Sequence, residues 1–480
     1  MSASSRQRLT AGGIVLSCGL WASTACAAPN IVMIVSDDQD TASMEIMPTV
    51  QKKLVQEGTT FSNAFVSLSL CCPSRSTFLT GQYAHNHGVF DNDMPDGGYP
   101  KLDHTKTLAV WLKNSGYHTA LMGKYMNKYG DYDTNPNDGL TAMQERPPGW
   151  TEWYGIVGKV GYYNYKINEN GIVKSYGSAP ADYSTDVIAK KADTFLRKSF
   201  NKPFFLWVAF KAPHNEGGPF PGPTPAPRHL GKFSQASPPR IPGYNELDVA
   251  DKPAYIRALL PLTGTLYSNM TTAYQRRLES LLAVDEGVQT IMKALEDTGK
   301  LSNTIVIYIS DNGWMTGEHR APGGKVLPYE PSIHVPLVIR GPGFLKERTV
   351  SDLVVNTDIA PTIVELAGAG PYVTRVMDGR SLVPLLTGTP TTWRTTFLIE
   401  SPPTGSLDSS YIDSPGFSGV RTDQYVYLEY LTGERELYDL KRDPYELYNE
   451  AQDPAYDSVK TDLQGRLGVL KPCVGGGCWQ

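Results

Sequence analysis

Continuously apolar runs of strand length recur along the first two thirds of this chain, and segments with helical periodicity separate them. Strands without polar alternation are typical of a sheet that is covered on both faces. The pattern predicts an α/β fold in which a large mixed, mostly parallel sheet is sandwiched by helices. The predicted strands are residues 31–35, 118–122, 204–210, 304–309 and 335–339, and the predicted helices are residues 107–114, 186–199 and 273–297.

The pattern changes near residue 391, where apolar positions begin to alternate in shorter segments such as 424–430. Turn signals at Thr432-Gly433 and Asp443-Pro444 separate these segments, and a helical segment, 458–470, follows them. We expect a main α/β domain at residues 29–390. Residues 391–480 are expected to form a C-terminal α+β subdomain, with a small antiparallel sheet and a helix.

Two stretches show no regular periodicity. Residues 130–180 are rich in Gly, Asn and Tyr, and residues 215–243 are rich in Pro and Gly. Long irregular segments inside a compact domain are usually functional or disordered. We interpret both stretches as ordered loops near a functional site.

Residues 1–28 have the layout of a secretory signal peptide. Arg6 and Arg8 precede an apolar stretch, residues 11–21, and small residues around Cys26 offer a cleavage site. This stretch is too short to span a bilayer, and no other segment is long and apolar enough to be a transmembrane helix. We therefore expect an exported protein, periplasmic or secreted. A lipid anchor at Cys18 or Cys26 is the alternative, although neither cysteine has a typical attachment context.

Composition and charge narrow the possible partners. Apolar residues make up 40% of the chain and charged residues 19%, which suits a globular protein with a substantial core. The formal net charge is −5, and no long run of Lys and Arg stands out. Because nucleic-acid binding requires a basic surface, we expect no nucleic-acid partner.

Four of the predicted strands are each followed by acidic, amide, ammonium or imidazole side chains. In chain order these are Asp37 and Asp38, Lys124, His214, and Asp311 with Asn312. In open α/β sheets, ligands bind beyond the carboxyl ends of the strands. We therefore expect these side chains to meet at one edge of the sheet.

The carboxylates and the amide of this set offer only hard oxygen ligands, which suit Ca²⁺, with Mg²⁺ second, and disfavour Zn²⁺. Taken alone, Asp37-Asp38 can equally be a solvated turn or a helix cap. Because Asp311 and Asn312 end a second central strand in the same way, we favour a metal site.

Four cysteines lie beyond the predicted signal peptide. Cys473 and Cys478 enclose a short flexible loop, which in an exported protein we interpret as a local disulfide, with a metal-binding pair as the alternative. Cys71 and Cys72 are adjacent, and adjacent cysteines rarely pair because the geometry is strained.

Cys71 lies just ahead of a predicted short helix. Pro73 suits the first turn of this helix and Gly81 its C-terminal end. The helix N-terminus favours negative charge near Cys71, and Arg75 lies one turn further on. From these residues alone, a buried thiol pair in a turn is a serious alternative.

Cys71-x-Pro73-Ser74-Arg75, followed by Leu79-Thr80-Gly81, resembles the signature of the type I, formylglycine-dependent sulfatases of the alkaline phosphatase superfamily. The resemblance runs from about Asn30 to the C-terminal sheet. Its other matching elements are Asp37-Asp38, Gly123-Lys124, Ala212-Pro213-His214, Asp311-Asn312-Gly313, Gly324-Lys325, Leu437-Tyr438-Asp439-Leu440 and Asp443-Pro444.

The resemblance implies a sulfuric ester hydrolase whose Cys71 is oxidised to formylglycine by a formylglycine-generating enzyme. One hydroxyl of the hydrated aldehyde then attacks the sulfur of a sulfate ester, and the second hydroxyl expels sulfate from the covalent intermediate. The implied ligands of the calcium ion are Asp37, Asp38, residue 71, Asp311 and Asn312. The other implied roles are neutralisation of the sulfate by Arg75, Lys124 and Lys325, contact of His214 with the bridging oxygen, and protonation of the leaving group by Asp311.

One position departs from the family pattern. Many members have a histidine two residues after the lysine that matches Lys124, whereas this chain has Met126, followed by Asn127. Asn127 can form a hydrogen bond but cannot act as a base, so the group that accepts the proton of the geminal hydroxyl is open. Residues 123–127, Gly-Lys-Tyr-Met-Asn, resemble the N-acetylglucosamine-6-sulfatase branch, as do Cys71-Cys72 and residues 162–165. This implies a sulfated sugar substrate, such as N-acetylglucosamine 6-sulfate in a glycan, with aryl sulfates as the alternative.

Several other side chains are candidates for a pocket or for the core. We expect a structural role for at least one of His85 and His87, and we expect His319 either to line a substrate pocket or to lie on the surface. Four aromatic residues can stack on a sugar ring, although core packing is the default expectation. These are Trp150, Trp153, Tyr154 and Tyr162.

Two other functions share parts of this pattern. A phosphonate or phosphate ester hydrolase of the same superfamily would use the same formylglycine and metal ion. A non-catalytic protein that binds sulfated glycans would require that Cys71 is not converted. The complete set of catalytic residue types argues against this second function.

Overall fold

The computed structural model describes residues 28–134, 136–216, 220, 222–401 and 412–480. The predicted signal peptide, residues 1–28, lies outside this part of the chain except for Ala28. No helix of the described residues is both long and apolar enough to cross a membrane.

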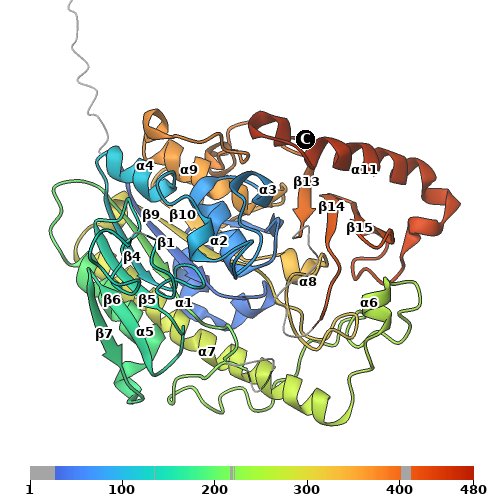
Figure 1. Cartoon of the computed structure of the whole chain (residues 1–480), viewed down its shortest axis with the longest axis horizontal. Helices are drawn as coiled ribbons and strands as arrows, with labels where there is room; N and C mark the ends of the chain where they lie inside the picture. The colour runs from blue at the N-terminus through green and yellow to red at the C-terminus, as the bar shows by residue number, and fades with distance from the viewer. Residues whose placement is uncertain (1–27, 135, 217–219, 221, 402–411) are drawn as a thin grey trace, which may run out of the picture.

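A ten-stranded sheet forms the centre of the main domain (Figure 1). Its strands, from edge to edge, are β11 (Arg348–Val350), β2 (Thr59–Phe61), β10 (Leu337–Arg340), β9 (Thr304–Ser310), β1 (Asn30–Ser36), β8 (Phe204–Ala209), β4 (His118–Gly123), β5 (Glu152–Val157), β6 (Tyr165–Glu169) and β7 (Ile172–Tyr176). The central run β9-β1-β8-β4-β5 is parallel, whereas β10 and β6 are antiparallel to their neighbours. The predicted mixed, mostly parallel sheet is confirmed.

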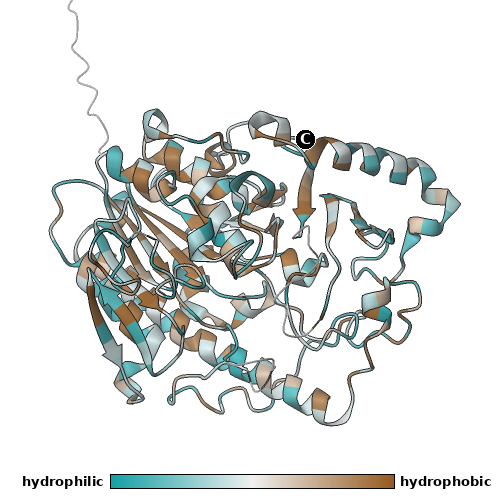
Figure 2. Ribbon diagram, in the orientation of Figure 1, coloured by the Kyte–Doolittle hydropathy of each residue, from teal (hydrophilic) through white to brown (hydrophobic). Residues whose placement is uncertain are grey.

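Alternate residues of the central strands face two separate apolar cores. On β1, Ile31, Met33 and Val35 pack into the first core, and Val32 and Ile34 into the second. Helices α2 (Cys71–Thr80), α4 (Leu108–Asn114) and α9 (Ile359–Leu366) cover the first core, and helices α5 (Ser184–Leu196) and α7 (Gly264–Asp297) cover the second. Figure 2 shows the apolar strands enclosed between these helices. Burial on both faces explains why the strands lack polar alternation.

All five predicted strands are present, and the three predicted helices correspond to α4, α5 and α7. Helix α7 begins nine residues before the predicted start at 273. Its first turns are mostly polar and therefore lack a clear apolar period, while Leu266 and Met270 pack on Tyr244 outside the main cores.

The prediction of an irregular loop at residues 130–180 is wrong, because β5, β6 and β7 lie there and extend the sheet by three strands. Asn170 and Gly171, with φ angles of 56° and 98°, form the turn of the β6–β7 hairpin. An Asn-Gly turn with two positive φ angles suits the twist of paired strands. The described part of 215–243 has neither helix nor strand, as predicted.

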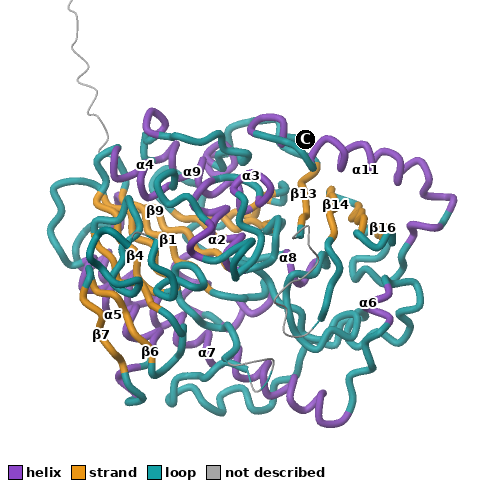
Figure 3. The backbone as a smooth tube through the Cα atoms, in the orientation of Figure 1, coloured by secondary structure: helices purple, strands orange, loops and turns teal. Residues whose placement is uncertain are grey.

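The C-terminal segment forms a separate four-stranded antiparallel sheet, β13-β14-β15-β16, which helix α11 covers (Figure 3). The predicted small C-terminal antiparallel sheet with a helix is thus confirmed. Cys473 and Cys478 form the expected disulfide. The strands are Thr396–Glu400, Phe417–Thr422, Tyr425–Tyr430 and Arg435–Asp439, and α11 is Asp457–Leu470. The remaining short elements are α1 (Pro48–Val50), α3 (Ala84–His87), α6 (Ala254–Arg257), α8 (Glu330–Ile333), α10 (Val383–Thr387), β3 (Ala64–Phe65) and β12 (Val354–Val355).

Candidate active site

The polar groups that follow β1, β4, β8 and β9 meet at one edge of the sheet, because these strands are adjacent and parallel. Backbone hydrogen bonds continue between the chain segments past the strand ends. The Asp37 N–H donates to the Ala212 carbonyl at 3.2 Å, and the Asp311 N–H donates to the Ser36 carbonyl at 3.1 Å. Asp37 and Asp311 therefore lie side by side, as the sequence predicts.

Helix α2 brings Cys71 to this edge. Cys71 is the first residue of the helix rather than the residue before it, and Gly81 ends the helix with a left-handed φ of 68°. The Cys71 Sγ lies 2.9 Å from Lys325 Nζ, 3.3 Å from Lys124 Nζ and 3.6 Å from Asp37 Oδ1. Burial raises the pKa of the Cys71 thiol although both ammonium groups oppose this effect.

Two buried ion pairs join the lysines to the carboxylates of β1. The distance is 2.5 Å from Lys124 Nζ to Asp37 Oδ2 and 2.5 Å from Lys325 Nζ to Asp38 Oδ1. Burial alone would raise the pKa of Asp37, but the nearby positive charges, above all Lys124, hold it well below its usual value. Asp37 is therefore an anion at neutral pH.

A third buried pair joins Arg75 to Asp311, with 2.8 Å between Nε and Oδ2. Arg75 also donates to the Lys124 carbonyl at 2.8 Å, and the Asp38 N–H donates to Asp311 Oδ1 at 3.1 Å. Burial and the negative charge of Asp37 raise the pKa of Asp311 to about 6. A cation bound at this edge of the sheet would oppose this shift, because positive charge favours the carboxylate.

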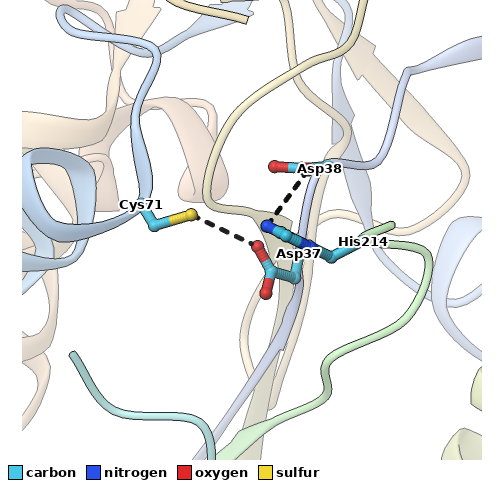
Figure 4. A group of neighbouring side chains, drawn as sticks. All are labelled: Asp37, Asp38, Cys71 and His214. Atoms are coloured by element: carbon cyan, nitrogen blue, oxygen red, sulfur yellow. Dashed lines mark hydrogen bonds and ion pairs between the residues drawn. The ribbon is translucent and has the colours of Figure 1, made fainter. Parts of the chain in front are cut away.

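The arrangement around Asp38 fits a hard metal ion. Asp37, Asp38, Cys71 and His214 each offer a ligand atom, and these atoms all lie within 4.8 Å of one another (Figure 4). Asp38 Oδ2 and Asn312 Oδ1 are buried and have no hydrogen-bond partner among the described residues. Buried acceptors of this kind require a ligand, such as a cation or an ordered water molecule.

His214 forms the more accessible side of this cluster, because 30% of its side chain is exposed. Its Nε2 lies 3.7 Å from Asp38 Oδ2, and the distance from its Nδ1 to the Asn215 carbonyl is 2.7 Å. Every residue predicted for the site is thus present at one edge of the sheet. The cluster of possible ligand atoms contains His214, which we predicted as a catalytic residue and not as a ligand, and it does not include the predicted ligand Asp311.

Arg277 is a site residue that sequence reasoning missed. It is buried on α7 and donates hydrogen bonds to the carbonyls of Asp38 and Pro213. Its guanidinium also lies 4.9 Å from the centre of the Trp314 ring. Asp38 has a left-handed φ of 69°, a conformation that is unfavourable for most residues and needs support from its surroundings. Arg277 therefore positions the loop that carries Asp38.

Replacing Arg277 by methionine is expected to lower kcat/KM and metal affinity by about 10- to 100-fold, as is typical when a partner of metal ligands is lost. Arg276→Met, at the less buried neighbouring position, is the matched control. Calcium titration separates positioning from folding, because a purely structural role would change the melting temperature without changing the affinity of the folded protein. Unchanged calcium affinity in Arg277→Met would contradict the positioning role.

The departure at Met126 and the second cysteine have structural explanations. Met126 packs in the first core, next to α2, with its Sδ 3.9 Å from the Ser76 hydroxyl. The Asn127 N–H donates to Cys72 Sγ at 3.0 Å, and burial raises the pKa of Cys72 to about 12. Cys72 is therefore an unreactive thiol, held by the chain segment that follows Lys124.

The other candidates pack in the structure. His87 bonds to the Thr77 hydroxyl at 3.1 Å, and His85 pairs with Glu400 at 2.9 Å. His319 is buried, pairs with Glu246 at 2.6 Å and lines a cavity of about 340 Å³, so the alternative of a surface position is wrong. The default of core packing is confirmed for Trp150, Trp153 and Tyr162, whereas Tyr154 is partly exposed.

Comparison with known proteins identifies similar sequences over nearly the whole chain. The profile of the family described as Sulfatase matches residues 29–369, and that of the C-terminal region of N-sulphoglucosamine sulphohydrolase matches residues 317–472. Human N-acetylglucosamine-6-sulfatase is 34% identical over 98% of this chain and 89% of its own length. An arylsulfatase of Volvox carteri is also 34% identical, over 96% of this chain and 77% of its own.

Solved structures agree with these sequence matches. A protein solved in complex with its substrate, D-glucosamine-2-N,6-O-disulfate, is 26% identical with a TM-score of 0.78, over 92% of this chain and 97% of its own. A phosphonate monoester hydrolase from Silicibacter pomeroyi is 23% identical with a TM-score of 0.71, over 91% of this chain and 94% of its own. At that identity the second likeness shows the fold alone.

Proposed function

This chain belongs to the sulfatase family of sulfuric ester hydrolases, and we propose that it removes sulfate from sulfated sugars, such as N-acetylglucosamine 6-sulfate units of a glycan. The similarity to N-acetylglucosamine-6-sulfatases and to a structure with a sulfated glucosamine as substrate supports this substrate class. The observation that carries the proposal is the buried cluster in which Cys71 contacts Lys124, Lys325 and Asp37.

The proposed nucleophile is formylglycine, which a formylglycine-generating enzyme would make from Cys71. Asp37, Asp38, Asp311, Asn312 and residue 71 would hold Ca²⁺, with Mg²⁺ as second choice. A bound ion of this kind supplies positive charge, which lowers the pKa of the attacking hydroxyl and neutralises a sulfate oxygen.

The other proposed roles belong to groups of the chain that already surround Cys71. Lys124, Lys325 and Arg75 would neutralise the remaining oxygens of the sulfate. His214, on the more accessible side, would contact the bridging oxygen. Asp311 would protonate the leaving group, as the resemblance to the family implies.

The similarity to sulfatases favours sulfate esters over phosphate and phosphonate esters. Lys124, Lys325 and Arg75 are each paired with a carboxylate, so the described side chains carry little net charge, and a bound Ca²⁺ would add two positive charges. A sulfate ester and a phosphonate monoester each have one negative charge at neutral pH and a phosphate monoester has up to two, so hydrolysis rates and not charge must separate these substrates. We expect nitrophenyl sulfate to be hydrolysed with a kcat/KM at least about tenfold above those of the phosphate and phosphonate analogues. Equal or faster hydrolysis of an analogue would favour the alternative, a phosphonate or phosphate ester hydrolase.

We also propose that the protein is exported to the periplasm or secreted, with residues 29–390 as catalytic domain and 391–480 as C-terminal subdomain. The disulfide between Cys473 and Cys478 suits an oxidising compartment. The proposed partners are the sulfated substrate and the maturation enzyme, without nucleic acid.

A further inference from the structure

A groove of about 390 Å³ lies between strand β7, at one edge of the large sheet, and helix α5. On α5, the lining residues Val187, Lys190, Lys191 and Thr194 recur at intervals of three and four, so they form one stripe of the helix. On β7, Lys174 and Tyr176 are two residues apart and therefore share one face of the strand. The groove is thus bounded by α5 on one side and by the sheet edge β5-β6-β7 on the other, where Tyr154 and Glu169 also line it.

The groove collects positive charge in a chain whose formal net charge is −5. Its lining contains four lysines and one glutamate. Lys191 pairs with Glu169 at 2.9 Å, and Lys198 pairs with Glu152 at 2.7 Å. Lys174 and Lys190 are exposed, and neither forms an ion pair with the described residues. Two ammonium groups therefore remain available to an anionic ligand.

Tyrosine rings form the floor beneath these amines. Lys191 Nζ lies 5.1 Å from the centre of the Tyr154 ring, and Lys174 Nζ lies 5.3 Å from the centre of the Tyr176 ring. Both rings are partly exposed. Tyr165 stacks on the Tyr176 ring at 5.1 Å, so the rings position the amines through cation–π contacts, and the ammonium groups suit the sulfate substituents of a sugar. The combination fits a sulfated glycan better than an uncharged one.

The position of the groove relative to the candidate active site suits a long substrate. Strand β7 is five positions from β1 in the sheet, which corresponds to roughly 24 Å at the usual strand spacing. Because β7 points in the same direction as β1, Tyr176 lies towards the sheet edge that carries Asp37. A glycan of several sugar units can span this distance.

The cavity of about 340 Å³ that Asp40 and His319 line is acidic, in contrast to the lysine-rich groove. Its lining includes four carboxylate residues and, within the described part of the chain, no Lys or Arg; the acids are Asp40, Glu318, Glu330 and Glu446. This lining therefore offers no lysine or arginine that could pair with the sulfates of a longer chain.

We propose that the groove between β7 and α5 is a secondary binding site for sulfated glycan, which holds the substrate chain at a distance from Cys71. The inference rests on the proposed function, because it assumes that the substrate is a sulfated sugar polymer. Lys174 and Lys190 supply the ion pairs, and Tyr154 and Tyr176 hold Lys191 and Lys174 in place through cation–π contacts.

A binding experiment tests the groove without turnover. In the inactive full-length Cys71→Ala protein, the double variant Lys174→Gln/Lys190→Gln is compared with Lys52→Gln/Lys113→Gln, which removes two exposed lysines outside the groove. We expect the dissociation constant of a fluorescent heparin octasaccharide to rise about fivefold in the groove variant and to stay nearly unchanged in the control. The difference in dissociation constant between the two variants should disappear at about 0.5 M NaCl, because salt screens exposed charges.

Activity measurements separate this inference from the proposed function. With intact Cys71, the groove variant should lose activity on the octasaccharide but retain the parent rate on nitrophenyl sulfate. Groove and control variants that bind the octasaccharide equally would overturn the secondary site. An equal loss of affinity for a single-stranded oligonucleotide of the same charge would overturn its assignment to sulfated glycans. Failure of the parent enzyme on every sulfate ester would instead contradict the proposed function.

Discussion

Replacing Cys71 by alanine is expected to reduce hydrolysis of nitrophenyl sulfate to the background rate, a loss of at least about 10³-fold. Alanine cannot be oxidised to an aldehyde, so the variant lacks both the attacking hydroxyl and the second hydroxyl that expels sulfate. The remaining groups, including Lys124, Lys325 and Arg75, can still bind the sulfate. The variant should therefore lose kcat and keep measurable affinity for a sulfated ligand.

The neighbouring position provides the matched control. Cys72 is as buried as Cys71, but its sulfur accepts a hydrogen bond from the Asn127 N–H and its pKa is raised to about 12. Cys72→Ala should retain activity within about tenfold, since it removes a packed thiol and not a reacting group. The intact mass of the peptide around residue 71 should show the conversion from thiol to aldehyde. Substantial activity in Cys71→Ala would overturn the nucleophile assignment.

The edge of the sheet that carries the site was predictable because two simple regularities combine there. Continuous apolar runs identify buried parallel strands, and parallel strands end at the same edge. Asp37 and Asp311 therefore had to lie close together once β1 and β9 were neighbours. The position of α2 followed from Pro73, Gly81 and the family signature, and only the exact first residue of the helix differed.

Arg277 could not be predicted in the same way. It comes from the middle of the 34-residue helix α7, 239 residues after the Asp38 carbonyl that it contacts. Arginines on amphipathic helices usually lie in solvent, and nothing in the local sequence distinguishes this one. Its role depends on how α7 crosses the sheet, which the pattern of one helix does not determine.

The groove between β7 and α5 could not be predicted from the sequence, for a related reason. The helical period of 186–199 was visible, but strand β7, which forms the opposite wall, lies in the stretch that we interpreted as irregular. The Asn170-Gly171 turn was the missed signal for that hairpin. A functional surface between two elements is predictable only when both elements and their packing are known.

Removal of the metal ion is expected to abolish activity. After treatment with a chelator, hydrolysis of nitrophenyl sulfate should fall by at least about 10²-fold, because the site loses its strongest positive charge. Ca²⁺ should restore activity best and Mg²⁺ less well, since the carboxylate and amide oxygens fit a large, hard cation. Zn²⁺ should not restore it, because Zn²⁺ prefers nitrogen and sulfur ligands. Retained activity after verified removal of all divalent ions would exclude the proposed metal site.

Asp38→Asn tests the same site through the chain itself. The substitution keeps the shape of the side chain but removes one negative charge, so the buried Lys325 loses its ion pair at 2.5 Å. Calcium affinity and kcat/KM should both fall by at least about tenfold, and added Ca²⁺ should restore part of the activity. Asp352→Asn is the control, because Asp352 is exposed and lies outside the site. If Asp38 is a metal ligand, the activity of the variant should depend on the Ca²⁺ concentration. If Asp38 is only the ion-pair partner of Lys325, added Ca²⁺ should have no effect on the activity.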